Sequence, residues 1–290
     1  MKKDLKYYLE KADKEKFALP QFNFSDLTQL KAIAEKCAEM KSPAIIATSE
    51  GESKFFGLQE AVAMRDVLVK KLGVPLFLNL DHGKSFEYLK EAGDAGYDMI
   101  HFDGSKLPFD ENIKITKEVV KYAKKKKIIV EGEMGKIGTD SSKLYTEKFV
   151  INEADLTKPK EAEDYVSQTG VNLLAISIGN FHGIEVSGID PNLRLDVLKV
   201  VKEKVGNKAG LVLHGGSGTP EDDIKEAIKQ GIVKININTE LRLAFSGNLR
   251  RFLTDNPEEI VPYKFLVNSK FSVARIAGLK INMFGSAGKA

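Results

Sequence analysis

Cysteine and long apolar segments are both scarce in this sequence. Cys37 is the only cysteine among the 290 residues, so no disulfide can form within the chain, and we expect a reducing compartment. It falls in a helical pattern, where a small buried apolar residue is the simplest interpretation. No apolar stretch is as long as a signal peptide or a membrane span, and the first six residues are rich in charge. The sequence therefore predicts a cytoplasmic protein with no membrane partner.

The charge balance gives no indication of a nucleic-acid partner. The net charge is +3 and 29% of the residues are charged, as in an ordinary soluble protein. The one pronounced basic run, 124–127, ends an amphipathic helical pattern, where lysines are solvated and interact favourably with the helix dipole. Neither interleaved aromatics nor Gly-rich basic repeats accompany it. We therefore expect a small-molecule substrate and no nucleic acid.

Short apolar runs alternate with segments of helical period along most of the chain. The runs are continuous rather than alternating, which indicates parallel strands buried on both faces by helices. Eight such runs in an unbroken rhythm match the strand count of a closed (β/α)8 TIM barrel, and 290 residues suit a single barrel domain. Strands are predicted at 19–22, 44–48, 76–80, 99–102, 128–131, 173–178, 210–213 and 233–236.

Helical patterns lie between these strands, and several begin with recognisable start signals. Asp26 and Ser85 suit N-caps, and Pro220 suits a first helical turn. An open doubly wound sheet is the competing α/β architecture, but no GxGxxG follows the first strand and the polar residues are spread over most strands. Helices are predicted at 26–40, 58–72, 85–95, 111–126, 160–169, 196–205, 220–229 and 240–253.

Three segments depart from this rhythm. Long polar connections at 135–158 and 183–195 are typical of lids or interface elements on a compact barrel. Near the C-terminus, a loop with Pro257 and Pro262 precedes a helical tail at 270–284. We therefore predict one domain over residues 1–290 with a C-terminal helical extension from about residue 254 to 290.

Three of the four histidines stand directly before glycine, each just past an apolar run: His82, His182 and His214. Any one of them alone could be a hydrogen-bonded core residue. Three imidazoles at separate strand ends instead suit a catalytic zinc site, which leaves one position open, whereas a closed structural site would favour cysteine. His101 lies within a strand pattern, and we interpret it as a core or supporting residue.

Acids, amides and glycines follow the same predicted strands. Asp81, Asp103, Glu131 and Glu133 lie at strand ends, where the active site of a barrel forms. Gly215 to Gly218 and Asn236 to Thr239 each lead from a strand into a helix. Backbone N–H groups there can approach an anion, and the last two strand loops commonly bind phosphate in this fold. A phosphorylated substrate is therefore expected.

In this order, the motifs resemble those of the class II, metal-dependent ketose-bisphosphate aldolases, which act on fructose or tagatose bisphosphate. The resemblance covers essentially the whole chain. It rests on these blocks: Gln21-Phe22-Asn23, Leu80-Asp81-His82-Gly83, Phe102-Asp103-Gly104-Ser105, Val130-Glu131-Gly132-Glu133, Gly179-Asn180-Phe181-His182-Gly183, Leu213-His214-Gly215-Gly216-Ser217-Gly218, Lys234-Ile235-Asn236-Ile237-Asn238-Thr239 and Phe284-Gly285-Ser286-Ala287-Gly288.

The resemblance implies a role for each matched position. His82, His182 and His214 would bind the catalytic Zn²⁺, and Asp103 with Glu133 would bind a second divalent ion. Asp81 would be the proton donor and acceptor, or alternatively a residue that orients a histidine. A homodimer or homotetramer is also implied. The implied contacts with dihydroxyacetone phosphate, its neighbouring Na⁺ or K⁺ and the rest of the sugar are Asn23, Ser49, Gly183, Gly215, Gly216, Ser217, Asn236, Ile237, Asn238 and Thr239.

A metal mechanism is also chemically consistent with the strand ends. Cleaving a carbon–carbon bond beside a carbonyl leaves an enediolate, whose charge is stabilised either by a metal or by a lysine Schiff base. The predicted sixth strand, 173–178, contains no lysine, and neither do the strand ends where histidines and acids gather. The metal route is therefore the one that this sequence supports.

The sequence departs from the family pattern in three places. The usual histidine two residues before the catalytic aspartate is Asn79 here. The acids of the loop after the fifth strand are absent, so Asp140, Glu147 or Glu153 would have to substitute. The Pro-Arg that reaches the distal phosphate is Pro262-Tyr263, followed by Lys264.

We therefore predict a class II aldolase that cleaves fructose 1,6-bisphosphate to dihydroxyacetone phosphate and glyceraldehyde 3-phosphate. The alternatives are an aldolase for tagatose bisphosphate or a ketose 1-phosphate, and a non-catalytic metal- and phosphate-binding barrel that serves as a sensor or scaffold.

Overall fold

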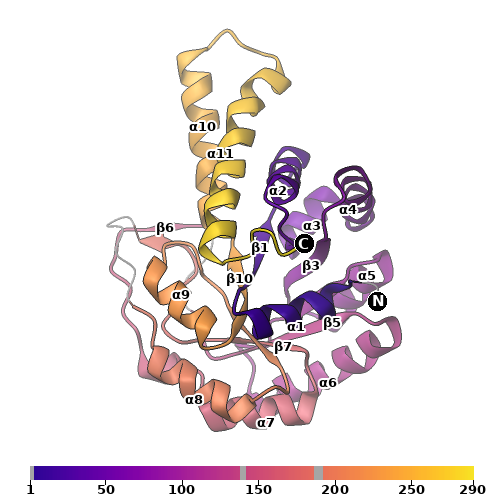
Figure 1. Cartoon of the computed structure of the whole chain (residues 1–290), viewed down its shortest axis with the longest axis vertical. Coiled ribbons are helices and arrows are strands. Elements are labelled where there is room, and N and C mark those ends of the chain that lie inside the picture. Colours follow the sequence, from indigo (N-terminus) through magenta and orange to yellow (C-terminus); the bar gives the residue numbers. More distant parts are fainter. Residues whose placement is uncertain (1–2, 138–141, 186–191) are drawn as a thin grey trace.

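The computed structural model describes residues 3–137, 142–185 and 192–290 as a closed parallel barrel surrounded by helices (Figure 1). All eight neighbouring strand pairs are parallel, which confirms the predicted single-domain (β/α)8 TIM barrel. Around the barrel the order is β1-β10-β9-β7-β5-β4-β3-β2. The strands are β1 (Leu19–Asn23), β2 (Ala44–Ser49), β3 (Leu76–Gly83), β4 (Met99–Phe102), β5 (Ile129–Met134), β7 (Leu173–Ile176), β9 (Gly210–Leu213) and β10 (Ile232–Ile237).

Each predicted strand coincides with an observed one, and the differences lie at the ends. The predictions ended at 80 and 131, but β3 continues through Asp81-His82-Gly83 and β5 through Glu133 to Met134, whereas β7 ends at Ile176, two residues before its predicted end. In both extended strands the extra residues are largely buried. The polar ends of these strands are therefore held by the sheet itself and not by loops.

The helices also follow the predictions closely, with two additions. The helices that were not predicted as separate elements are α1 (Leu5–Glu15) and α3 (Glu50–Phe56). A capping box between Ser49 and Glu52 begins α3 directly at the end of β2. The others are α2 (Leu27–Glu39), α4 (Leu58–Leu72), α5 (Phe86–Ala95), α6 (Phe109–Lys126), α7 (Pro159–Thr169), α8 (Leu195–Val205), α9 (Glu221–Lys229), α10 (Thr239–Asp255) and α11 (Pro262–Met283).

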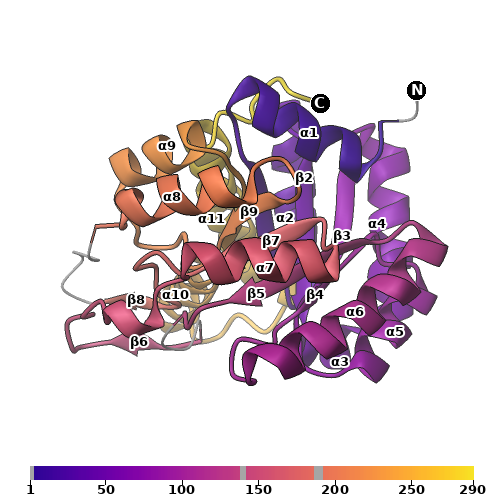
Figure 2. The same ribbon diagram turned by 90° about the horizontal axis from the view of Figure 1, so that it is seen from below.

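The two ends of the barrel are covered differently. At the amino end, α1 buries Leu5, Tyr8 and Leu9 against residues at the starts of the strands, among them Phe77 and Ile129. At the carboxyl end lie the short parallel strands β6 (Leu144–Tyr145) and β8 (Ile184–Glu185), which Figure 2 shows far from α1. The amino end of the barrel is thus closed by apolar packing, whereas the carboxyl end is covered by loops.

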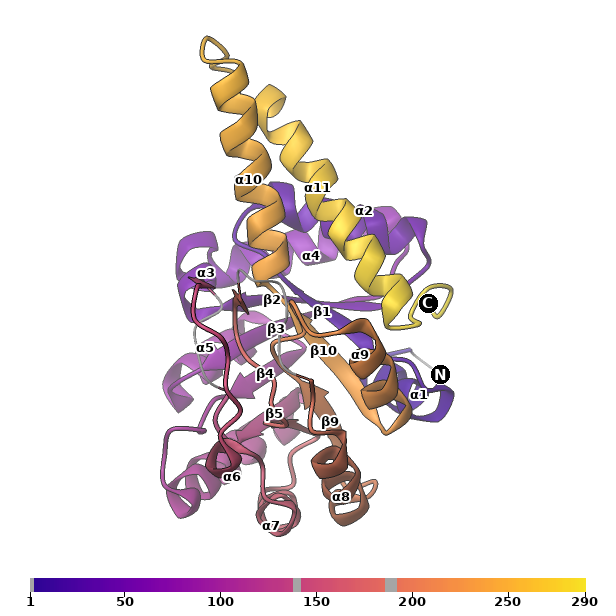
Figure 3. The ribbon, with the colours of Figure 1, turned by 90° about the vertical axis from the view of Figure 1, so that its left-hand side faces the viewer.

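Helices α10 and α11 form an antiparallel hairpin, here called the arm, that projects well beyond the barrel (Figure 3). The prediction that the tail helix starts at residue 270 was wrong, because α11 begins at Pro262, a residue that suits a first helical turn. The arm exposes large apolar side chains, including Ile260 (83%), Tyr263 (76%) and Phe271 (66%). None of the helices described is long and apolar enough to cross a membrane.

Candidate active site

The carboxyl end of β3 holds His82 in an unusual backbone conformation. Its φ is +51°, in the left-handed region that residues other than glycine rarely adopt. The pairing of β3 with β4 shifts register between Leu80 and Gly83, and the His82 N–H donates to Nδ1 of His101 over 3.1 Å. Strain of this kind is found where the surrounding structure fixes a functional side chain.

The three histidines expected to bind zinc lie together at this end of the barrel. The ring centroid of His82 is 4.8 Å from that of His214 and 5.0 Å from that of His182, and all three pairs are edge to face. Nε2 of His82 is 3.1 Å from Nδ1 of His214. The two tightest groups of potential ligand atoms in the described chain are Asp81, His82, His101 and His214, and His82, Asp103 and Glu133, so His182 stands slightly apart.

The acids expected to bind a second ion converge on the other nitrogen of His82. Nδ1 of His82 is 3.0 Å from Oδ2 of Asp103 and 3.6 Å from Oε2 of Glu133. Asp103 also accepts a 2.6 Å hydrogen bond from the Ser105 hydroxyl. Burial would raise the pKa of Asp103, but the nearby His82 outweighs it and lowers that pKa strongly. The carboxylate is therefore ionised.

His101 is fully buried and surrounded by acids. Its Nε2 is 3.2 Å from Oε2 of Glu133, and its Nδ1 is 3.6 Å from Oδ1 of Asp81. Burial would lower the pKa of His101, but the charges of Glu131, Asp81 and Glu133 raise it to about 10. Its Nδ1 accepts from the backbone N–H of His82 and its Nε2 faces Glu133, so both ring nitrogens are engaged by protein groups, which agrees with its interpretation as a supporting residue.

The remaining donors fit a divalent metal. Burial, reinforced by the charge of His82, lowers the pKa of both His182 and His214, so both imidazoles are in the neutral form that binds metals. Burial lowers the pKa of His82, but Asp81 and Asp103 raise it overall, so metal binding there would release a proton. Among the described residues, Oε2 of Glu133 and Nε2 of His101 are buried without an aligned hydrogen bond. A cation nearby would satisfy that carboxylate oxygen.

Two amides fix the orientation of Asp81, which is 5% exposed. Nδ2 of Asn23 donates to Oδ2 of Asp81 over 3.0 Å, and Nδ2 of Asn236 donates to Oδ1 over 3.2 Å. Burial would raise the pKa of Asp81, but the charge of His82 and the contact with His101 lower it well below its ordinary value. The carboxylate is therefore ionised and held from two sides, by β1 and by β10.

A buried ion pair supports His214 from below. Nζ of Lys234 lies 2.9 Å from Oε2 of Glu131, and Oε1 of Glu131 lies 2.7 Å from Nε2 of His214; all three side chains are fully buried. Lys234 also donates to Oδ1 of Asn236 over 2.7 Å. Sequence reasoning assigned no role to Lys234, although a lysine inside an otherwise apolar barrel strand is a signal that it needs a buried carboxylate as its partner.

The expected phosphate contacts line a small pocket, here called the narrow cavity, of about 30 Å³. Gly215 has a φ of +63°, and a Cβ there would lie 1.9 Å from the carbonyl oxygen of Phe181, so only glycine fits. Gly216 and Ile237 do not line it, since the Ile237 side chain is wholly buried in the core. The lining residues are Asn23, Asp81, His82, His182, Gly183, Gly215, Ser217, Asn236, Asn238 and Thr239.

A larger pocket, here called the wide cavity, adjoins the narrow one and has a volume of about 540 Å³. The two share Asp81, His82, His182 and Asn238, so the catalytic groups stand between them. Ser49 lines the wide cavity, on the side where the resemblance places the rest of the sugar. Its cationic side chains are those of Lys84, Lys106, Lys136 and Arg242, none of which the sequence had indicated.

The three departures noted in the sequence lie in different surroundings. Asn79 is buried and donates to Oε1 of Gln21 over 2.9 Å. Among the candidate loop acids, Asp140 lies outside the described residues, Glu147 is exposed, and Glu153 pairs with Arg194. Tyr263 lies in the first turn of α11 on the arm and lines neither cavity.

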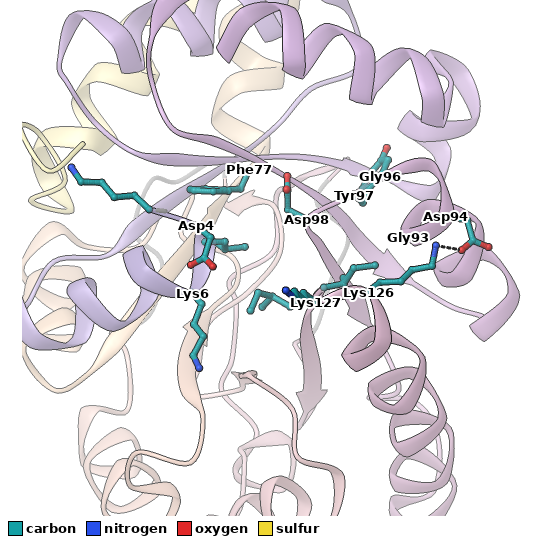
Figure 4. A pocket seen from close by; sticks show the side chains of 14 residues that line it. Asp4, Lys6, Phe77, Gly93, Asp94, Gly96, Tyr97, Asp98, Lys126 and Lys127 are labelled. Atoms are coloured by element: carbon teal, nitrogen blue, oxygen red, sulfur yellow. Dashed lines mark ion pairs between the residues drawn. The ribbon is translucent and has the colours of Figure 1, made fainter. Parts of the chain in front are cut away.

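The amino end of the barrel has a pocket of its own, here called the base cavity, also of about 540 Å³ (Figure 4). Its walls include the ring of Phe77 and charged groups from α1, α5 and α6. Lys126 pairs with Asp94 at 2.6 Å, and Asp98 pairs with Arg65. No histidine lines it, and its acids are engaged already: Asp94 and Asp98 pair with cations, and Asp4 caps α1.

Comparison with known proteins agrees with this geometry. A family model described as class II fructose-bisphosphate aldolase matches residues 3–289. The crystal structure of the YdjI aldolase from Escherichia coli K12 is similar, with 31% identity and a TM-score of 0.82 over 99% of this chain and 98% of that one. Fructose-bisphosphate aldolase from Campylobacter jejuni shares the fold, with 22% identity and a TM-score of 0.82 over 97% of this chain and 94% of that one.

Proposed function

This chain belongs to the class II fructose-bisphosphate aldolase family, and we propose that it reversibly cleaves fructose 1,6-bisphosphate to dihydroxyacetone phosphate and glyceraldehyde 3-phosphate. One observation carries the proposal: Asp81 stands beside the histidine cluster and borders both cavities. A ketose bound across the two cavities would place its reacting bond next to this carboxylate. Groups on either side of that bond would then have separate binding surfaces.

We assign the metal ligands by the donor set. His82, His182 and His214 would hold Zn²⁺, and Asp103 with Glu133 would hold a second divalent ion. When bound, the zinc supplies Lewis-acid stabilisation of the charge that develops on the carbonyl side of the breaking bond. Glu131 and Lys234 contribute by fixing one side of the His214 ring, which sets its orientation.

Asp81 is the proton-transfer group of the proposed reaction. In cleavage, its carboxylate accepts the proton of the hydroxyl on the carbon that becomes the aldehyde, and in condensation it returns that proton. Asn23 and Asn236 keep both oxygens in place, because each amide donates to a different one.

The narrow cavity would hold the phosphate of dihydroxyacetone phosphate. Its lining has no lysine or arginine, so the anion would be bound by backbone N–H groups, Ser217 and Thr239, with Gly183 and Gly215 allowing close approach. A monovalent cation, Na⁺ or K⁺, would balance charge at this end. Asn23, Ser49 and Asn238 complete the proposed substrate contacts, whereas Gly216 and Ile237 line neither cavity.

The alternatives differ in substrate or in the absence of catalysis. Tagatose 1,6-bisphosphate differs from fructose 1,6-bisphosphate in one hydroxyl configuration, and fructose 1-phosphate lacks the distal phosphate. Release of dihydroxyacetone phosphate from each ketose, with and without a chelator, separates these cases. Activity that survives complete metal removal, or that borohydride traps as a covalent adduct, contradicts the metal mechanism. Metal binding without turnover of any ketose favours a sensor or scaffold.

We also propose that the protein is a homodimer or homotetramer in the cytoplasm. The arm supports self-association, because it carries several large exposed apolar side chains, among them Ile260, Tyr263 and Phe271, on one projecting hairpin. We expect Phe271→Asp to shift the sedimentation coefficient toward that of a monomer. Lys6→Asp, on exposed α1, serves as the matched control and should leave it unchanged. A single 32.1 kDa species for the unmodified protein would contradict this proposal.

A further inference from the structure

The charge around the narrow cavity is finely balanced. Among the described residues that line it, the ionisable side chains are Asp81, which is ionised, and the two histidines assigned to zinc. A phosphate bound there would be held mainly by hydroxyl and backbone N–H groups, so an unbalanced carboxylate beside the cavity would weaken its binding. Glu240 carries such a carboxylate, because it lies in the first turn of α10, one residue after Thr239 of the cavity wall.

Glu240 nevertheless contributes to the cavity, because it holds the glycine loop that follows β9. Its Oε1 accepts from the backbone N–H of Gly218 over 3.0 Å, and its own backbone N–H donates to Oγ of Ser217 over 3.4 Å. A hydroxyl that accepts a hydrogen bond keeps its proton for another acceptor, so Ser217 can still donate to an anion. Glu240 therefore anchors two consecutive residues of the loop that the proposed function assigns to phosphate.

Lys280 supplies the balancing charge from the other helix of the arm. It lies in the last turn of α11, and its Nζ is 2.7 Å from the same Oε1 of Glu240 that accepts from Gly218. Lys280 is only 6% exposed, and an ammonium group buried to this degree requires a carboxylate partner. Glu221 of α9 also interacts with Lys280, but it pairs with Lys225 at 2.6 Å. Lys280 is therefore the cation that balances Glu240.

Building on the proposed function, we propose that Lys280 is a positioning residue for the phosphate of dihydroxyacetone phosphate, although it lines neither cavity. It acts through Glu240 in two ways. It cancels a negative charge beside the anion site, and it orients the carboxylate that holds Gly218. Glu240 can anchor the loop without repelling the phosphate only while Lys280 balances its charge. The base of the arm, where α10 and α11 meet the barrel, thus forms part of the phosphate site (Figure 3).

The first test measures the affinity for dihydroxyacetone phosphate by isothermal titration calorimetry on the zinc-loaded protein, which requires no turnover. Lys280→Met should raise Kd about 10-fold, because the charge of Glu240 is no longer balanced. In ketose cleavage, KM should rise by a similar factor and kcat should change less than about threefold, since Asp81 and the histidines are untouched. A Lys280→Met protein with a lower melting temperature but an unchanged Kd would contradict the inference, because Lys280 would then serve the fold alone.

Double variants separate the balance of charge from the anchoring of the loop. Glu240→Gln with Lys280→Met keeps an amide oxygen for the Gly218 N–H and leaves no unpaired charge, so Kd should return to within about threefold of the unmodified value. Glu240→Ala with Lys280→Met offers that N–H no acceptor, and its Kd should stay high. If Glu240→Gln with Lys280→Met binds as weakly as Lys280→Met alone, the charge-balancing role is wrong.

Lys270→Met is the matched control. Lys270 also lies on α11 and pairs with an acid of another helix, Glu35 of α2, at 2.5 Å, but neither residue lines the narrow cavity. Its Kd for dihydroxyacetone phosphate should equal that of the unmodified protein. An equal rise in Kd in Lys270→Met and Lys280→Met would overturn the inference, because both ion pairs would then act through the stability of the arm.

The proposed function and this inference fail in different ways. If the unmodified protein neither binds dihydroxyacetone phosphate nor cleaves any ketose phosphate, the proposed function fails and the inference falls with it. An active enzyme whose Kd and KM are the same with and without Lys280→Met overturns the inference alone.

Discussion

The wide cavity at the carboxyl end of the barrel and the base cavity at its amino end have the same volume, about 540 Å³, but opposite chemistry. The wide cavity adjoins buried histidines, an ionised carboxylate and glycine turns. The base cavity is bounded by apolar side chains of the strand starts and by acids that are paired with a cation or cap a helix. Volume therefore does not distinguish a catalytic pocket. What distinguishes it is a set of polar side chains that the fold holds in place and that face the cavity.

The direction of the strands explains the difference. Parallel strands point all their carboxyl ends one way, so side chains from β3, β4, β5, β9 and β10 meet at one end. The strand starts are instead covered by Tyr8 and Leu9 of α1 and by Phe17, which follows that helix. Substitutions at the carboxyl end should therefore reduce activity much more than substitutions at the amino end.

The largest effect is expected at Asp81. Asp81→Ala should reduce kcat for ketose cleavage by about 10²- to 10⁴-fold, since it removes the proton-transfer group. Zinc should stay bound, because the three histidines remain. Initial rates and metal content by elemental analysis measure both. Loss of zinc together with activity would mean that Asp81 instead orients the histidines.

The second-largest effect is expected from removal of the metal, which should reduce both activity and thermal stability. With free metal at 100 times its Kd, binding adds about 2.7 kcal/mol to the free energy of unfolding, so chelation should lower the melting temperature. Restoring Zn²⁺ should restore both activity and melting temperature. His182→Ala provides the comparison, because a protein without that ligand should respond less to chelator. A melting temperature that chelator does not change would argue against a metal at this end.

The next test concerns the buried ion pair between Lys234 and Glu131, whose carboxylate contacts the His214 ring. Glu131→Gln leaves the ammonium group of Lys234 buried without its carboxylate partner, and it should lower the free energy of unfolding, measured in urea, by about 3 to 5 kcal/mol. The double variant Glu131→Gln with Lys234→Met should recover most of that free energy. Burial would raise the folded pKa of Glu131, but Lys234 and His101 lower it overall, so the stabilisation is present above the unfolded pKa of about 4.3. The gap between Glu131→Gln and the unmodified protein should therefore narrow as the pH falls below that value. A gap that widens would contradict the assignment.

The smallest effect is expected at the base cavity. Lys126→Gln removes the exposed pair with Asp94, a kind of surface pair that contributes little, and should change kcat/KM by less than about twofold. Steady-state kinetics measured alongside Asp81→Ala complete the comparison between the two ends. A large loss of activity in Lys126→Gln would show that the ends are coupled.

The barrel and the cluster of histidines could be predicted from the sequence because both leave periodic or repeated signals. Eight buried runs fixed the strand count, and His-Gly pairs marked three strand ends. Glu131 stood at a predicted strand end, but its partner Lys234 could not be identified, since pairing across the barrel depends on which strands are neighbours in space. The same holds for Arg242 and Glu52, which are far apart in the chain and meet only because α10 and α3 follow neighbouring parts of the rim.

The start of α11 was also missed, because two prolines near the end of the chain suggested a longer loop. Pro262 instead occupies the first helical turn, where a missing N–H costs nothing. Exposure of one face of the arm weakens the apolar periodicity on which helix prediction depends. An element whose partner is another surface is harder to recognise from its own sequence than one packed on the core.

The ion pair inside the barrel also shows how the two halves of the chain share the site. Glu131, Lys234, His214 and Asn236 all come from the second half of the chain, on β5, β9 and β10, whereas Asn23, Asp81 and His82 come from the first. A chain cut between β4 and β5 would keep Glu131 with Lys234 and His214 in one fragment. It would part Asp81 from Asn236, His82 from His214 and His101 from Glu133. The ion pair below His214 would thus be retained within one fragment, while the catalytic groups would meet only in the reassembled pair.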